Sequence, residues 1–242
     1  MIVKMERLDE LHRKNYVIFQ DTEKFCFGTD AVLLSSFVTM QKNANVLDLG
    51  TGNAIIPILL CARHNSGHIT GLEIQKDSVV LAQKSIEKNL LEDRISIVEG
   101  DIKNVPTIFK GRKFDVVVSN PPYMKGQDIN AQDAKAIARH EILCTLEDVV
   151  KAAFYVLKSA GSFFMVYRPE RVVDALAVLR ENKLEPKIIR FVHANVDKEP
   201  KLVLIKAVKG GKMGCNVLAP LIMYNSDGAL TAEAYQIYYG EA

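Results

Sequence analysis

The sequence predicts an α/β fold with a seven-stranded, mostly parallel sheet and an antiparallel edge strand. Three observations lead to this prediction. From Asn45 onward, short apolar runs alternate with helix-length stretches, as in parallel sheets with crossover helices. The first run ends in a glycine turn that leads directly into an apolar helix. Each of the first four runs is followed by polar residues, which is where an open α/β sheet binds its ligand.

Residues 1–242 are expected to form a single domain with an extension at each end. In the N-terminal extension, 1–40, the segments 16–20 and 24–27 predict a hairpin that precedes a helix. The main body is expected to contain strands at 45–48, 68–74, 94–99, 114–119 and 161–167, helices at 55–63, 131–157 and 168–182, and an antiparallel strand pair at 188–193 and 202–207. The C-terminal extension, 217–242, is expected to contain a turn and a helix at 231–238.

The glycine turn after the first strand carries the first functional signal. Such a turn lets a ligand approach the backbone, with helix N–H groups directed at it. A dinucleotide-binding turn would need a third glycine at Ile55, whereas Asp48 suits a ligand that carries an ammonium group. These features favour S-adenosyl-L-methionine, whose methionine end is a zwitterion. The residues expected to contact it here are Asp48, Gly50, Thr51, Gly52 and Asn53.

The second strand ends at Glu73, about twenty residues beyond the glycine turn, the spacing at which an acid receives ribose hydroxyls. An ionised carboxylate only accepts hydrogen bonds, so it can take both hydroxyl protons. A glutamate after a strand is also common as the first acid of a helix. With the glycine turn upstream, ribose binding is favoured, and Ile74 is expected beside it.

The fourth strand is followed by the tetrapeptide Asn120-Pro-Pro-Tyr123. Two prolines stiffen the backbone, and the residue before a proline is held extended, so the amide of Asn120 is displayed. A planar amide, carbonyls without competing donors and an aromatic ring form a clamp for a flat molecule that bears an amino group. The tetrapeptide resembles the catalytic motif of methyltransferases that act on planar amino nitrogens, and Asn120 is also expected to border the cofactor.

Nearly the whole chain resembles the bacterial tRNA adenine-N6 methyltransferases that modify valine tRNA beside its anticodon, a branch of the class I, Rossmann-like enzymes that use S-adenosyl-L-methionine. The stretches that carry the resemblance are Phe27-Gly-Thr-Asp-Ala-Val-Leu-Leu34, Asp48-Leu-Gly-Thr-Gly52, Ser119-Asn-Pro-Pro-Tyr-Met124, Ala138-Arg-His-Glu141 and Leu221-Ile-Met-Tyr-Asn-Ser-Asp-Gly-Ala-Leu-Thr231 with Ile237-Tyr-Tyr-Gly240. At Ala54 the enzymes of this class usually have a glycine.

The resemblance implies roles for individual residues. Asp101 would accept the adenine amine of the cofactor while Ile102 packs on its ring. The catalytic residues implied are Asn120, Pro121, Pro122 and Tyr123, and substrate contacts are implied for Lys125, Arg139 and His140. The implied partner is tRNA, through its anticodon stem-loop.

Other functions fit the same clamp. Glutamine N5-methylation of a protein such as a release factor predicts a separate N-terminal docking module, but only about forty residues precede the first cofactor strand. Guanine-N2 methylation of rRNA is a further alternative. A non-enzymatic RNA-binding module is disfavoured because both Asn120 and the glycine turn are intact.

Composition excludes several classes of protein. The net charge of +2 is too small for a general polyanion binder. The basic residues are unevenly distributed, with an excess of Lys and Arg from 183 to 212 and a second group formed by Lys103, Lys110, Arg112 and Lys113. An RNA substrate would require such basic groups beside the site, although lysines on a solvated surface are also common. No signal peptide or membrane-length apolar run is present, so a cytoplasmic protein is expected. The expected oligomeric state is a monomer or a weak dimer. The four dispersed cysteines and few histidines predict buried free thiols and no metal site.

Overall fold

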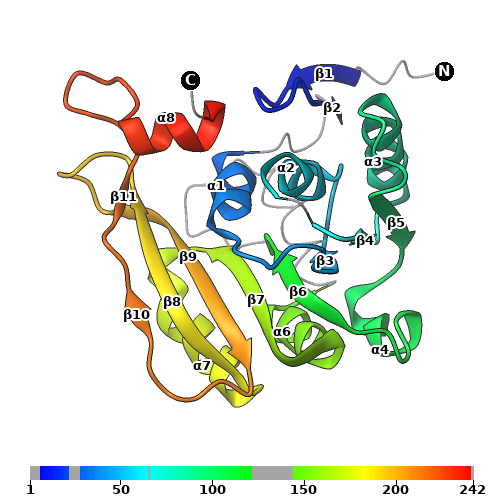
Figure 1. Ribbon diagram of the computed structural model, residues 1–242. Helices are drawn as coiled ribbons and strands as arrows, with labels where there is room; N and C mark the ends of the chain where they lie inside the picture. Colours follow the sequence, from blue (N-terminus) through cyan, green and yellow to red (C-terminus); the bar gives the residue numbers. More distant parts are fainter. Residues whose placement is uncertain (1–5, 22–27, 65, 122–143, 241–242) are drawn as a thin grey trace, which may run out of the picture.

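The computed structural model describes residues 6–21, 28–64, 66–121 and 144–240. Helices cover both faces of a central nine-stranded sheet (Figure 1). Its strands follow the order β10-β8-β9-β7-β6-β3-β4-β5, and β11 pairs with β8. Their bounds are β3 (Val46–Leu49), β4 (Ile69–Glu73), β5 (Ile95–Glu99), β6 (Phe114–Ser119), β7 (Leu157–Tyr167), β8 (Leu184–His193), β9 (Pro200–Lys209), β10 (Asn216–Val217) and β11 (Leu221–Ile222).

The strand directions confirm the predicted fold class. The neighbours from β5 through β4, β3 and β6 to β7 are parallel, whereas β9 is antiparallel to both β7 and β8. The antiparallel strand β9 therefore lies between β7 and β8 rather than at the outer edge. The seven long strands are those that the sequence predicts, and the two-residue strands β10 and β11 bring the sheet to nine.

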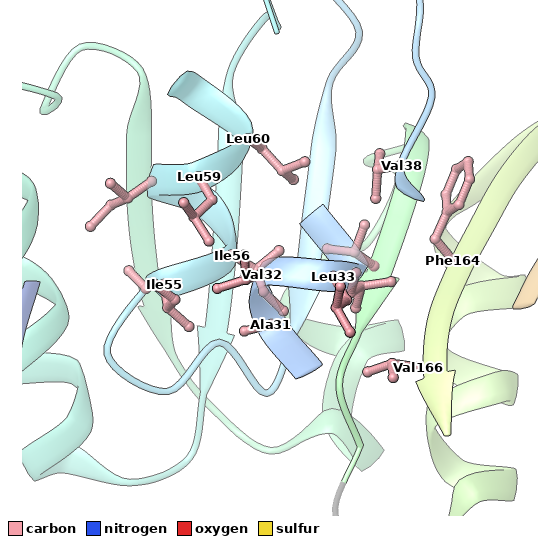
Figure 2. Packing of buried hydrophobic residues seen from close by; sticks show 14 of the residues in the cluster. Ala31, Val32, Leu33, Val38, Ile55, Ile56, Leu59, Leu60, Phe164 and Val166 are labelled. Atoms are coloured by element: carbon pink, nitrogen blue, oxygen red, sulfur yellow. The ribbon is translucent and has the colours of Figure 1, made fainter. Parts of the chain in front are cut away.

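The sheet is buried on both faces because side chains alternate along each strand. On β3, Val46 belongs to one core cluster and Leu47 to the other. The first cluster packs under helices α1 (Thr29–Phe37), α2 (Ile55–Arg63), α3 (Lys76–Lys88) and α8 (Ala232–Tyr239). Figure 2 shows its centre, where α1 lies between α2 and the residues Phe164 and Val166 of β7. The second packs under α4 (Val105–Ile108), α6 (Leu146–Val156) and α7 (Val172–Glu181), with short 3-10 turns at Ile102–Asn104 and Pro169–Arg171.

The predicted hairpin differs from the observed one. Strand β2 (Val17–Asp21) pairs antiparallel with the upstream strand β1 (Glu6–Glu10), which the sequence did not predict because its residues are nearly all polar. Residues 24–27, the expected partner, lie outside the described residues, as do residues 131–143 of the expected long helix. The side chain of Ile18 is fully buried in the first core cluster, so β2 is packed against the main body.

The C-terminal extension is tied to the same core. Leu221, Met223 and Ala234 are buried in the first cluster. Helix α8 begins after Thr231, whose side chain accepts a hydrogen bond from the N–H of Ala234 at 3.2 Å. At the other end of α8, the guanidinium of Arg63 donates to the carbonyl of Ile237 at 2.5 Å.

Candidate active site

Four adjacent parallel strands bring the predicted site residues to one edge of the sheet. In the order β6-β3-β4-β5, these strands all end at this edge. The N–H of Gly100, after β5, donates to the carbonyl of Glu73 at the end of β4 at 2.9 Å. The hydroxyl of Ser119 donates to the carbonyl of Leu49 at 2.8 Å, which ties the ends of β6 and β3 together. The site is therefore held by contacts between strands.

The turn between β3 and α2 adopts a left-handed backbone at three positions. Gly50, Gly52 and Ala54 have φ of 76°, 57° and 71°. The N–H groups of Gly50 and Thr51 donate to the carbonyl of Leu72 at 2.9 and 3.0 Å. A Cβ built on either glycine would have no atom within 4 Å, so the glycines are needed for their backbone angles, and open space lies beside the turn. Ala54 adopts the left-handed conformation, which glycine adopts more readily, at the position where the resemblance led us to expect a glycine.

Asp48 has a fully buried carboxyl group, and only one of its two oxygens has a hydrogen-bond partner among the described residues. Its Oδ2 accepts a hydrogen bond from the hydroxyl of Thr51 at 2.7 Å. Its Oδ1 has no hydrogen-bond partner among the described residues. Burial raises the pKa of Asp48 to about 7; the hydrogen bond from Thr51 opposes the shift, and the charge of Glu73 adds to it. A buried carboxylate with a free oxygen fits a ligand that carries an ammonium group.

Glu73 pins the glycine turn from the neighbouring strand. It is almost fully buried, and its Oε2 accepts from the N–H of Gly52 at 2.9 Å. Its Oε1 accepts from the N–H of Gln75 at 2.8 Å. Each carboxylate oxygen keeps a second lone pair, so Glu73 can also accept hydroxyl groups of a ligand. Ile74, which follows it, is 41% exposed and offers an apolar side chain beside it.

Gly71 and Ser119 are positioning residues that the sequence analysis missed. A Cβ on Gly71 would lie 2.7 Å from Cγ2 of Thr51 and 2.8 Å from Cδ1 of Ile97, so only glycine lets Thr51 approach β4. The signal was present, because a glycine inside an apolar strand marks close approach. Ser119 gave no such signal, since its hydrogen bond to Leu49 joins residues seventy positions apart.

The remaining predicted residues divide into two groups. Asp101 lies at the end of β5, where its side chain caps a 3-10 turn by accepting from the N–H of Lys103 at 2.9 Å. Ile102 packs partly buried against the second core cluster. Asn120, half-buried, and Pro121, buried, follow β6 directly. The predicted residues that lie outside the described residues are Pro122, Tyr123, Lys125, Arg139 and His140.

Asn53, also predicted to contact the cofactor, has its side chain directed elsewhere. Its Nδ2 donates to the carbonyl of Phe19 on β2 at 3.0 Å. What faces the open space beside the glycine turn is therefore the backbone around Asn53 rather than this amide.

In the second basic group, Lys103 lies two residues after Asp101 at the site, whereas Arg112 and Lys113 lie away from it. Arg112 and Lys113 precede β6, at the sheet edge opposite to Asn120. The guanidinium of Arg112 lies 5.1 Å from the ring centroid of Phe114 and donates to the hydroxyl of Thr70 at 3.1 Å. Lys113 donates to the carbonyl of Tyr155 at the end of α6. These side chains stabilise the fold, and the structure gives no support for a substrate-binding role at this edge.

In the basic run from 183 to 212, the side chains of Lys187, Arg190 and Lys209 are engaged in structural contacts. Lys209 donates to the carbonyl of Leu157 at 2.9 Å, and Lys187 to that of Lys212 at 2.9 Å. Arg190 forms a two-pronged ion pair with Glu233, at 2.7 and 2.8 Å.

Within the described part of the chain, no cluster of three or more His, Cys, Asp or Glu side chains is arranged to hold a metal ion. Among the same residues, no helix is long and apolar enough to span a membrane. Cys61 is buried, as expected, but Cys215 is exposed, contrary to the prediction of buried thiols.

Comparisons with known proteins agree with this geometry. The methyltransferase small domain family matches residues 21–183. A Parabacteroides distasonis protein named tRNA1(Val) (adenine(37)-N6)-methyltransferase is 28% identical over 195 residues, which are 80% of this chain and 81% of the relative. A Bacteroides thetaiotaomicron protein of the same name is 31% identical over 162 residues, 66% of this chain and 67% of the relative.

Two solved structures show the same fold. A predicted O-methyltransferase of Agrobacterium tumefaciens has a TM-score of 0.72 at 22% identity and covers 88% of this chain and 97% of its own. The T. thermophilus 16S rRNA N2 G1207 methyltransferase, solved with AdoMet and guanosine, has a TM-score of 0.59 at 20% identity. The match covers 84% of this chain and 50% of the T. thermophilus chain.

Proposed function

Because the chain belongs to the methyltransferase small domain family, we propose that it transfers a methyl group from S-adenosyl-L-methionine to N6 of an adenine in the anticodon loop of a tRNA. The relatives named as tRNA1(Val) (adenine(37)-N6)-methyltransferases support this choice of substrate. The observation that carries the proposal is the buried Oδ1 of Asp48, which has no hydrogen-bond partner among the described residues. Asp48 lies on β3, and the neighbouring strand β6 leads into Asn120 and Pro121.

The residues present fit the cofactor. Asp48 would accept a hydrogen bond from the ammonium group at Oδ1, and the ligand would approach through the open space beside Gly50 and Gly52. Glu73 would accept the ribose hydroxyls with its remaining lone pairs. Asp101 would accept the adenine amine, while Ile74 and Ile102 pack against the ring. The backbone of Thr51 and Asn53 completes this side of the site.

When bound, S-adenosyl-L-methionine supplies a methyl group activated by its sulfonium. An adenine amine is a poor nucleophile because its lone pair is delocalised into the ring. The amide oxygen of Asn120 and the carbonyl of Pro121 would accept the two N–H protons of the amine, which directs its lone pair towards the methyl group and stabilises the charge that develops on nitrogen. No strong general base is required, because the proton becomes acidic once the nitrogen is methylated.

The other catalytic and substrate contacts in the proposal come from the sequence. Pro122 would stiffen the clamp, and Tyr123 would stack on the target base, which is worth about 1–3 kcal/mol. Lys125, Arg139 and His140 would contact the RNA. A base in a hairpin loop enters such a pocket more cheaply than a duplex base. A tRNA substrate implies that the protein works in the cytoplasm, and a monomer or weak dimer suffices for this site.

The proposal is tested by transfer of labelled methyl from S-adenosyl-L-methionine into total tRNA from a strain that lacks this protein, followed by nucleoside mass spectrometry. The expected product is N6-methyladenosine beside the anticodon of one tRNA. If the protein binds the cofactor but labels no tRNA, the tRNA proposal is wrong. Parallel assays with rRNA and with a release factor would then test guanine-N2 and glutamine N5 methylation.

A further inference from the structure

Strand β2 has one edge paired with β1 and the other edge covered by side chains instead of a strand. The N–H of Val17 donates to Oδ1 of Asn89 at 2.9 Å, and its carbonyl accepts from Nδ2 of the same residue at 2.7 Å. The N–H of Phe19 donates to Oγ of Ser85 at 3.0 Å, and its carbonyl accepts from Nδ2 of Asn53 at 3.0 Å. The N–H and C=O groups of Val17 and Phe19, which face away from β1, therefore all have hydrogen-bond partners.

The side chains that cover this edge come from α3 and from the glycine turn of the candidate cofactor site. Ser85 and Asn89 lie on and just after α3, the helix that follows Glu73 and β4. Asn53 lies in the glycine turn itself, between two residues with a left-handed backbone, Gly52 and Ala54. The turn is thus held on one side by the carboxylate of Glu73 and on the other by the backbone of β2.

This contact is partly buried. Ser85 and the neighbouring β2 residue Ile18 are fully buried, whereas Asn53 and Asn89 are half-buried. Loss of one partner would leave a partly buried polar group without its hydrogen bond, so each of these hydrogen bonds favours one position of β2. The carbonyl of Leu72 and the carboxylate of Glu73 hold the turn on the side of β4, and the hydrogen bond from Asn53 to Phe19 adds a contact on the side of β2.

We infer that β2 is a positioning element of the cofactor site, and that the side chain of Asn53 acts as a positioning residue that transmits the docking of β2 on α3 to the glycine turn. The inference rests on the proposed function, since the ligand of the turn is taken to be S-adenosyl-L-methionine. It adds a part of the N-terminal extension to the cofactor-binding machinery.

The test measures binding of S-adenosyl-L-methionine by calorimetry to the full-length wild type, to Asn53→Ala and to the double variant Ser85→Ala/Asn89→Ala. Both variants should bind about tenfold more weakly, because each breaks the same connection between α3, β2 and the glycine turn; a tenfold change corresponds to about 1.4 kcal/mol. A triple variant that combines Asn53→Ala with Ser85→Ala/Asn89→Ala should bind no more weakly than Asn53→Ala alone. The effects are not additive because Ser85 and Asn89 influence the glycine turn only through the hydrogen bond of Asn53 to β2. At saturating cofactor, kcat of the double variant should stay within about twofold of wild type, since Asn120 and Pro121 are unchanged.

Asn182→Ala is the matched control. Asn182 ends α7 and donates from Nδ2 to the carbonyl of Val178 at 2.8 Å, as Asn89 ends α3 and donates to the carbonyl of Ser85 at 2.6 Å. It lies on the opposite face of the sheet from β2. The control should lose stability without any change in cofactor affinity.

Wild-type affinity in the double variant would overturn the inference, even if Asn53→Ala binds weakly, because the effect would then be local to the turn. Should the double variant fail to fold, Ser85→Ala alone carries the test, with about threefold weaker binding expected and unchanged affinity overturning the inference. If the wild type does not bind S-adenosyl-L-methionine, the proposed function itself is wrong, and the inference fails with it.

Discussion

Asp48 shows how a single residue links the stability of the fold to the chemistry of its site. Its carboxyl is fully buried, one oxygen has no hydrogen-bond partner among the described residues, and its pKa is raised from 3.8 to about 7 by burial. Such a group is unfavourable when ionised without a counter-ion. The fold keeps it at the place where a cationic ligand group would compensate for the charge.

We therefore predict that Asp48→Asn removes a pH dependence of stability. Between pH 4 and 7 the folded wild type holds a proton that the unfolded chain has released, so its stability falls as pH rises through this window and levels off above pH 7. Relative to the wild type, the variant should gain about 4 kcal/mol between pH 4 and pH 8. Urea unfolding of both proteins without ligand at the two pH values measures this difference. If the free energies of unfolding of the two proteins change equally between the two pH values, Asp48 is ionised in the folded wild type throughout this range.

Asn120 is predicted to act on the reaction and not on the cofactor. It follows β6, whereas the groups proposed for the cofactor lie mainly on β3 and β4. Asn120→Ala should lower kcat at least about 100-fold by the loss of one preorganised acceptor, with cofactor affinity nearly unchanged. Single-turnover methyl transfer and calorimetry separate the two effects. Wild-type turnover in the variant would rule out the clamp mechanism.

At the scale of elements, the contact between β4 and the glycine turn depends on Gly71. Its neighbour Thr51 would lie 2.7 Å from an added Cβ and also donates to Asp48. Gly71→Ala should destabilise the protein by about 1–3 kcal/mol through overpacking and should weaken cofactor binding, because Thr51 must move. Chemical denaturation and calorimetry report the two changes.

Thr145→Ala provides the matched control for Gly71→Ala. Thr145 and Asp148 form a capping box at the start of α6, on the other face of the sheet. Its loss should cost about 1 kcal/mol of stability with cofactor affinity unchanged. Equal loss of affinity in both variants would mean that binding follows global stability and not the position of Thr51.

At the scale of the whole molecule, both terminal extensions meet at the end of α8. Arg13, from the turn after β1, and Arg63, from the end of α2, both donate to the carbonyl of Ile237. Burial lowers the pKa of Arg63 to about 10, and the charge of Arg13 contributes. The hydrogen bonds to carbonyl oxygens, together with the dipole of α8, compensate for placing two cations close together.

From this arrangement we expect the chain to unfold in one cooperative transition. Arg63→Ala should lower the free energy of unfolding by about 2–3 kcal/mol, as for other charged hydrogen bonds, and shift the whole transition. Circular dichroism and tyrosine fluorescence, to which Tyr235, Tyr238 and Tyr239 on α8 contribute three of the eight tyrosines, should give the same midpoint. Arg180→Ala, which breaks only the surface pair with Glu185 at 3.4 Å, should change stability by less than about 0.5 kcal/mol. An earlier fluorescence midpoint would show that the C-terminal extension unfolds separately.

The sequence alone determined the order of the elements and the chemistry at the strand ends, because both depend on local patterns. Apolar periodicity marks strands and helices, a glycine turn needs particular backbone angles, and the strand ends at Asp48, Glu73, Asp101 and Asn120 follow from a parallel sheet. Only the tertiary structure decided how these ends are held. The pairing of β2 with β1 and with α3, the carboxylate of Glu73 on Gly52, and the unmet oxygen of Asp48 all depend on residues that meet only after folding. Local propensity does not encode such contacts, because they arise from the packing of segments far apart in the chain.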